Sequence, residues 1–172
     1  PDLLETNFLI SFIKKDKKIL DIGCGNGIFL ERLSKKIIFK SALGIDYSAG
    51  MIFEAKKRKL KRTKFEVIDM TNKNQIKSIN QKFDYIISKR SLINLSSFAE
   101  QTKVLENFSD LLNKHGRILC CENSLTALRN INFARKKINL KKIVAPWHNK
   151  YIDNKKLIKF KFKKIRLVKF YE

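Results

Sequence analysis

The sequence contains few of the residues that break or cross-link a chain. Its 172 residues include 6 glycines, 2 prolines and 3 cysteines, and no linker, internal repeat or low-complexity segment is visible. Cys24, Cys120 and Cys121 form no metal-ligand spacing. We therefore expect a reduced, cytoplasmic protein without a metal site.

Long apolar runs are also missing. No stretch approaches the roughly 20 apolar residues of a membrane span, so the sequence predicts none. Hydrophobic residues still make up 44% of the chain, which is enough for one core. We expect a single domain over residues 1–172.

Acidic residues are outnumbered, 16 against 38 lysines and arginines, for a formal net charge of +22. Such a charge can attract RNA, DNA or an anionic membrane surface. The lysines are nevertheless spread along the chain among many Ile, Asn and Phe, a bias that an AT-rich genome produces whatever the function. Nucleic acid therefore stays open as a partner but is not favoured by charge alone.

Half of the scarce glycines lie together. The apolar run Ile19–Ile22 is followed by Gly23, Gly25 and Gly27, and Ile28 opens a stretch with apolar residues at helical spacing. The pattern predicts a buried strand, a glycine turn and a helix. Such a turn lets a ligand approach the backbone, and the helix start offers free N–H groups.

The spacing of these glycines differs from that of the dinucleotide fingerprint G-x-G-x-x-G, because Ile28 occupies the position of the third glycine in that pattern. With Asp21 in front, the stretch Asp-Ile-Gly-Cys-Gly-Asn-Gly resembles the first motif of class I S-adenosylmethionine-dependent methyltransferases. The resemblance covers most of residues 18–122. It implies a Rossmann-like α/β fold: a mostly parallel central sheet, helices on both faces, and a last antiparallel strand left incomplete. A tight turn without a ligand is the alternative.

Later strands end in acids. The apolar pattern of residues 41–48 predicts a strand that ends at Asp46. This acid lies about 20 residues beyond the glycines, a position from which an acid can accept hydrogen bonds from ribose hydroxyls. Asp46 could instead cap a helix, although Ser48 can supply that cap. By resemblance, S-adenosylmethionine is the cofactor and Asp69 accepts from its adenine amino group. The cofactor-binding residues so implied are Asp21, Gly23, Gly25, Gly27, Asp46, Tyr47, Met51, Asp69, Met70 and Ser88.

Apolar spacing also predicts the remaining elements. Helices are expected over residues 3–13 and 51–60, the latter with Ile52, Phe53 and Ala55 inward, and from Ser97 to a stop at Gly116. Strands are expected over 65–70, 83–88 and 117–121, and an antiparallel edge strand over 163–171.

Residues on the acceptor side are harder to assign. The Asn/Asp-Pro-Pro-aromatic motif of amino-directed DNA and protein methyltransferases is absent, and so is the Pro-Cys nucleophile of cytosine-ring carbon methyltransferases. We expect residues 1–17 to form an N-terminal helix and residues 123–160 to form the substrate-pocket helix and loop. The candidate substrate-binding residues are Arg90, Asn94, Arg129, Trp147, Asn149 and Tyr151.

Transfer to a hydroxyl benefits from a general base, for which His148 is the first candidate and Glu122 the second. The sequence therefore predicts methyl transfer to a small-molecule acceptor, a hydroxyl of a sugar or related metabolite. Two alternatives stay open: an RNA methyltransferase and a non-catalytic methyltransferase-like binding domain. The oligomeric state is not predicted.

Overall fold

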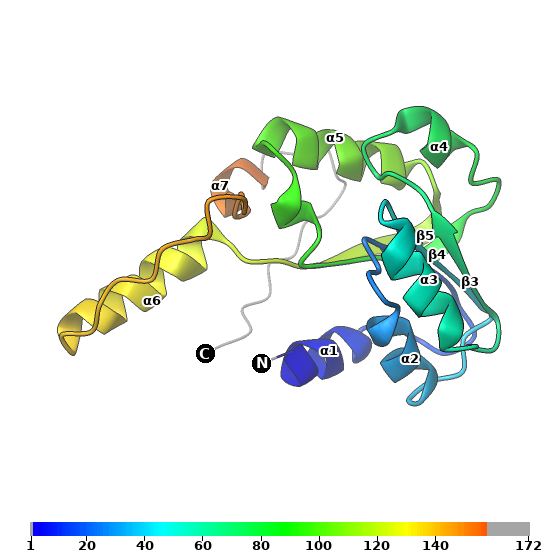
Figure 1. Ribbon diagram of the computed structural model, residues 1–172, viewed down its shortest axis with the longest axis horizontal. Helices are drawn as coiled ribbons and strands as arrows, with labels where there is room; N and C mark the ends of the chain where they lie inside the picture. Colours follow the sequence, from blue (N-terminus) through cyan, green and yellow to red (C-terminus); the bar gives the residue numbers. More distant parts are fainter. Residues whose placement is uncertain (1, 158–172) are drawn as a thin grey trace.

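A five-stranded parallel sheet forms the centre of the molecule, in the order β3-β2-β1-β4-β5. The computed structural model describes residues 2–157, and Figure 1 shows the arrangement of their elements. The strands are β1 (Lys18–Ile22), β2 (Ser41–Asp46), β3 (Thr63–Val67), β4 (Phe83–Lys89) and β5 (Leu112–Cys121). The predicted α/β fold class is confirmed.

The strand order reverses beside β1. The chain moves outward from β1 through β2 to β3, then returns to the other side of β1 with β4 and continues to β5. In open parallel sheets, ligands bind outside the carboxyl ends of the strands at this reversal. The glycine turn, residues 23–27, follows β1 directly.

Helices cover both faces of the sheet. The apolar cluster on one face takes side chains from α1 (Asp2–Ile10), α2 (Ile28–Ser34) and α3 (Ala49–Lys57). The cluster on the other face takes them from α4 (Lys73–Lys77) and α5 (Phe98–Ser109). Strand residues buried on both faces match the near-continuous apolar runs of the sequence.

Two local predictions were wrong. Phe53 is 62% exposed, because only Ile52 and Ala55 of α3 face the core. Gly116 does not end a helix: α5 stops at Ser109, and Gly116 lies inside β5. A Cβ at Gly116 would lie 2.9 Å from the Phe83 carbonyl oxygen, beside the register shift between Phe83 and Tyr85. The glycine is needed there because two strands approach closely.

The chain beyond β5 leaves the sheet. Helix α6 (Leu125–Lys137) has no buried residue and projects away from the strands in Figure 1. The chain then returns along it, and an isolated bridge joins Ile152 to Ser124 before the short α7 (Asn154–Leu157). The predicted edge strand over 163–171 lies outside the described residues. Among residues 2–157, no helix combines the length and apolar character needed to cross a bilayer.

Candidate functional site

The glycine turn has a left-handed backbone at all three of its glycines. Their φ angles are +66° at Gly23, +53° at Gly25 and +76° at Gly27, a region that side chains other than glycine rarely adopt. A Cβ at Gly23 would lie 2.4 Å from Ser91 Cβ, and one at Gly27 would lie 2.8 Å from the Phe65 ring. A Cβ at Gly25 would meet nothing within 4 Å. Gly25 therefore borders open space, while Gly23 and Gly27 are closely packed.

Asp46 fixes this turn from the end of the neighbouring strand. Its Oδ2 accepts from the Gly25 N–H at 2.9 Å, and its Oδ1 accepts from the Ser48 N–H at 2.9 Å. The Asp46 side chain is buried at 9% exposure, yet each carboxylate oxygen retains a second lone pair. Ser48 caps α3 by accepting from the Met51 N–H. Asp46 is thus free of the helix cap that the sequence left as an alternative.

Asp21 lies under the turn, within β1. Its side chain is 2% exposed, and no residue in the described range donates a hydrogen bond to its Oδ2. Burial raises the pKa of Asp21 to about 8, with a smaller raising effect from Asp46 and a lowering effect from Lys89. A buried acceptor without a partner is costly unless a donor reaches it. Asp21 Oδ2 is therefore a polar atom beneath the glycine turn that the described residues leave unsatisfied.

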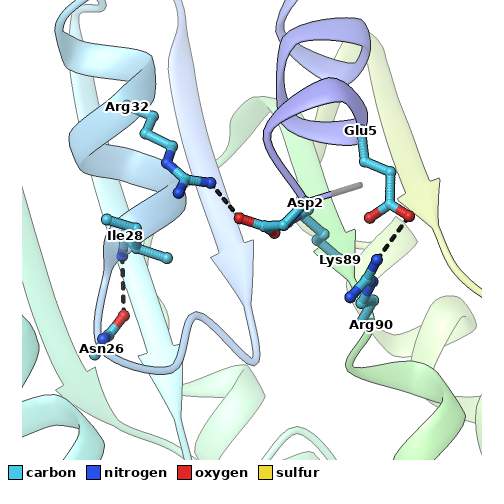
Figure 2. Close-up of polar contacts among 7 residues, drawn as sticks. All are labelled: Asp2, Glu5, Asn26, Ile28, Arg32, Lys89 and Arg90. Atoms are coloured by element: carbon cyan, nitrogen blue, oxygen red, sulfur yellow. Dashed lines mark hydrogen bonds and ion pairs between the residues drawn. The ribbon is translucent and has the colours of Figure 1, made fainter.

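The N-terminal helix is tied across the same edge by ion pairs. Figure 2 shows Asp2 of α1 between Arg32 of α2 and Lys89 at the end of β4, with both of which it pairs. Glu5 pairs with Arg90 at 2.7 Å. Lys89 and Arg32 together hold the pKa of Asp2 at about 2. Helix α1 is thus held beside the end of β4.

Glu122 organises the segment that follows β4. Its Oε1 accepts from Ser88 Oγ at 2.5 Å and from the backbone N–H groups of Ser91 and Leu92, and its Oε2 accepts from that of Ile93. Burial raises the pKa of Glu122, and these hydrogen bonds act in the opposite direction. The carboxylate therefore holds the short 3-10 turn η1 (Leu92–Asn94) against the sheet.

The other predicted cofactor residues gather at the same edge, with different exposure. Ser88 is buried, and its Oγ lies 2.8 Å from Ser91 Oγ. Met70 Cε lies 3.2 Å from where a Gly23 Cβ would stand. Tyr47 and Met51 are 76% and 48% exposed and offer apolar surface. After β3, Asp69 Oδ1 accepts from the Thr71 N–H and hydroxyl.

The predicted substrate residues are only partly brought together. Asn149 Nδ2 donates to Asn94 Oδ1 at 2.8 Å, so the loop after α6 meets the segment after β4. His148 is exposed, and its ring meets that of Trp147 edge-on with centroids 5.4 Å apart. Arg90 is engaged by Glu5.

Two substrate candidates remain. Arg129 is exposed on α6, and Tyr151 packs against the core.

Sequence reasoning missed three side chains at this edge. Ser91 donates to the Ile22 carbonyl at 2.9 Å and packs on Gly23. Gln101 of α5 is buried, and its Nε2 donates to the carbonyls of Leu92 and Lys150. Asp2 was treated only as part of a helix. Ser91 carried a usable signal, as a small polar residue just beyond a predicted strand; Gln101 carried none.

The parts of this edge fit a nucleoside cofactor with an amino-acid end. Open space borders the Gly25 backbone, Asp46 keeps lone pairs for hydroxyl donors, and Asp21 Oδ2 lacks a donor. Within residues 2–157, no group of three or more His, Cys, Asp or Glu could hold a metal ion. The fold and this edge define the chain as a class I methyltransferase-type α/β domain, the type that uses S-adenosylmethionine.

A family model described as a methyltransferase domain matches residues 13–164, and the chain belongs to this family. The candidate methyltransferase 235L of Invertebrate iridescent virus 6 is 36% identical over 87 residues, 50% of this chain and 31% of that protein.

Two solved structures share the fold. An S-adenosylmethionine-dependent methyltransferase from Clostridium acetobutylicum is 26% identical with a TM-score of 0.61, over 76% of this chain and 54% of that one. The sugar N-methyltransferase KedS8 from Streptoalloteichus is 22% identical with a TM-score of 0.60, over 72% and 49%. The chain thus spans 31% to 54% of the length of these relatives.

Proposed function

We propose that this chain binds S-adenosylmethionine at the glycine turn and transfers its methyl group to a small-molecule acceptor. One observation carries the proposal: Asp46 holds the Gly25 N–H at 2.9 Å while the space beside Gly25 is open. A buried carboxylate that fixes a left-handed glycine beside open space leaves the backbone of the turn accessible to a ligand. A nucleoside that approaches this backbone would meet Asp46 there.

When bound, S-adenosylmethionine supplies an electrophilic methyl carbon on a sulfonium. The chain's own residues bind and orient it. Asp46 accepts from the ribose hydroxyls, Asp21 Oδ2 accepts from the amino group, and Asp69 accepts from the adenine. Tyr47 and Met51 give apolar surface to the base. Met70 packs beside Gly23, and the buried Ser88 supports the turn through its hydrogen bond with Ser91.

The acceptor side is assigned to residues 123–160 together with the end of β4. His148 takes the hydroxyl proton as general base, and Trp147 and Tyr151 offer flat surface to a ring. The hydrogen-bonded pair Asn94 and Asn149 joins the two halves of this surface. Arg90 and Arg129 position polar groups of the acceptor.

Glu122 is assigned to positioning rather than proton transfer, because four donors already hold its carboxylate. A sugar or related hydroxyl metabolite is the acceptor class we propose. The sugar N-methyltransferase with the same fold supports a sugar scaffold without fixing the acceptor atom.

Calorimetry with S-adenosylhomocysteine tests the cofactor site. The parent chain should bind, and Asp46→Ala should lose about 30-fold or more in affinity, since a charged hydrogen-bonding partner is removed. Glu106→Ala, which removes an exposed carboxylate from α5, is the matched control and should bind as the parent does. Equal affinities for all three proteins would refute the site.

Turnover separates an enzyme from a binding domain. Methyl-labelled S-adenosylmethionine is offered with a panel of monosaccharides and nucleotide sugars, and labelled product is counted. His148→Ala should lower kcat by about 100-fold while S-adenosylhomocysteine affinity stays unchanged. A His148→Ala protein with the parent kcat would remove the base assignment, and cofactor binding without any labelled product would favour a binding domain.

A further inference from the structure

Positive charge is not distributed evenly over the described chain. Between residues 123 and 157 the sequence has one acid, Asp153. The cations of this segment are Arg129, Arg135, Lys136, Lys137, Lys141, Lys142, Lys150, Lys155 and Lys156. Every ion pair of the described residues lies between residues 2 and 90. The cations after β5 are therefore not neutralised by carboxylates.

Most of these cations lie on a projecting arm. We call residues 125–147 the basic arm: α6 and the chain that runs back beside it, yellow to orange in Figure 1. Asn132 joins the two halves by exchanging hydrogen bonds with the Ile143 backbone at 2.9 and 2.8 Å. Arg135 Nε adds a bond to the Lys141 carbonyl at 2.7 Å. The arm is thus an ordered pair of segments without a core of its own.

The basic arm also exposes large apolar side chains. Phe133 is 65% exposed, Ile138 66%, Val144 77% and Trp147 89%, and no residue of α6 is buried. An open groove of about 800 Å³ runs between the two halves. Its lining mixes the two kinds of side chain, with Leu125, Leu128, Phe133 and Leu140 beside Lys136 and Lys141.

We propose that the basic arm docks on an anionic lipid bilayer surface. An element with Lys and Arg beside exposed Phe, Trp and aliphatic residues binds at the lipid headgroup boundary: the apolar side chains enter and the cations contact anionic headgroups. The exposed aliphatic residues select lipid over nucleic acid, since base stacking uses aromatic rings and Arg and gives Ile138 and Val144 no partner.

Charge argues against two other occupants. A second copy of this chain would bring an equally basic arm against the first, and like charges repel. Residues 158–172 carry six more lysines or arginines and one acid, Glu172, so they are no better matched to the basic arm. An anionic surface is the complement that the arm lacks. Arg129 and Trp147 belong both to this arm and to the proposed acceptor surface, but docking on a bilayer does not depend on methyl transfer.

Vesicle binding tests the proposal on the full chain, and Trp147, the chain's only tryptophan, reports on it. Vesicles of phosphatidylcholine and phosphatidylserine at about 7:3 should bind the protein and shift its tryptophan emission to the blue. Vesicles of phosphatidylcholine alone should bind at least about tenfold less. Binding to both alike, or no shift of the emission, would overturn the proposal.

Two sets of variants separate charge from insertion. K136E/K141E/K142E should lose most binding, while the control K56E/K59E/K61E, equal in charge change and equally exposed on α3 and the loop after it, should keep it. Phe133→Ser with Leu140→Ser should lose the binding that survives high salt. A control that fails as much as the arm variant, or a serine variant that binds as the parent does, contradicts docking by the arm.

Circular dichroism first shows that each variant is folded, and K141E/K142E replaces the triple variant if that one is not. Two further measurements address the rejected occupants. A mixed-sequence single-stranded RNA that binds more tightly than the phosphatidylserine vesicles, and equally well to the serine variant, would assign the arm to nucleic acid. A concentration-dependent dimer that the serine variant abolishes would assign it to a second copy. Either result overturns the proposal.

Discussion

Charged groups at the carboxyl edge of the sheet are paired within the described part of the fold, whereas the cations of the basic arm are not. At the edge, Asp46, Glu122 and Asp2 are each held by two or more donors or cations from other parts of the fold. In the basic arm no helical residue is buried and no cation is paired with an acid. The same lysine-rich composition therefore yields a site of hydrogen-bonded and ion-paired groups in one region and an open charged surface in the other.

This difference shows that a cation of this protein can have one of two roles. A cation such as Lys89 helps to hold the fold because a carboxylate of another element faces it. A cation such as Lys136 has no such partner in the described chain and is available to an external anion. Net charge alone could not distinguish them. The following predictions test whether stability resides at the sheet and not in the basic arm.

The largest contrast is expected between two phenylalanines. Phe108 of α5 is fully buried, whereas Phe133 of α6 is 65% exposed. Phe108→Ala should lower the free energy of unfolding by about 3–5 kcal/mol, and Phe133→Ala by less than about 0.5 kcal/mol. Urea unfolding measures both. A loss above about 1.5 kcal/mol for Phe133→Ala would mean that the arm is packed.

A second contrast lies within the glycine turn. Gly23→Ala should cost about 2–4 kcal/mol of stability, because its Cβ would lie 2.4 Å from Ser91 Cβ and its φ is +66°. Gly25→Ala, also left-handed but without a neighbour within 4 Å, should cost about 1 kcal/mol. It should nevertheless weaken S-adenosylhomocysteine binding, because its methyl group enters the open space.

Thermal unfolding and calorimetry on the same two proteins give both readouts. If Gly25→Ala binds S-adenosylhomocysteine as the parent does, the open space beside Gly25 is not the cofactor site.

Glu122 gives a smaller effect. Glu122→Ala leaves three backbone N–H groups and Ser88 without their acceptor, and should lower the free energy of unfolding by about 1–3 kcal/mol. Glu122→Gln keeps one acceptor oxygen and should recover part of that loss. Denaturant titration measures it. If Glu122→Gln is as stable as the parent but has a tenfold lower kcat, Glu122 is instead the general base.

A dependence on pH is expected from Asp21. Its folded pKa of about 8 lies above the ordinary value of 3.8, so between these values the folded state binds more protons than the unfolded state. Stability associated with Asp21 is complete below about pH 4 and is lost progressively as pH rises toward about 8. Asp21→Asn removes this loss.

Melting temperatures of the parent and of Asp21→Asn from pH 5 to about pH 8 compare the two. The parent should fall relative to the variant as pH rises. Parallel curves would show that Asp21 keeps an ordinary pKa and that another group donates to it.

Much of the edge could be predicted before the fold was known. The apolar run before Gly23 predicted β1, and the next apolar run predicted β2 with Asp46 at its end. These predictions worked because parallel strands end at one edge, so that residues distant in sequence become neighbours. The hydrogen bond from Gly25 to Asp46 was not predicted. Predictions about single side chains were weaker. Phe53 and Gly116 depended on how close a neighbouring element came, and local pattern does not encode that distance.

The sequence alone determined the class of fold, the turn and the acids around it, because strand burial and glycine conformation are local properties read from residue type and spacing. Only the tertiary structure decided that Glu122 holds the backbone after β4, that Arg90 pairs with Glu5, and that the cations after β5 have no acid to meet. Each of these depends on which groups face one another across the fold. The order of residues in the sequence does not show which groups will face one another in the folded protein.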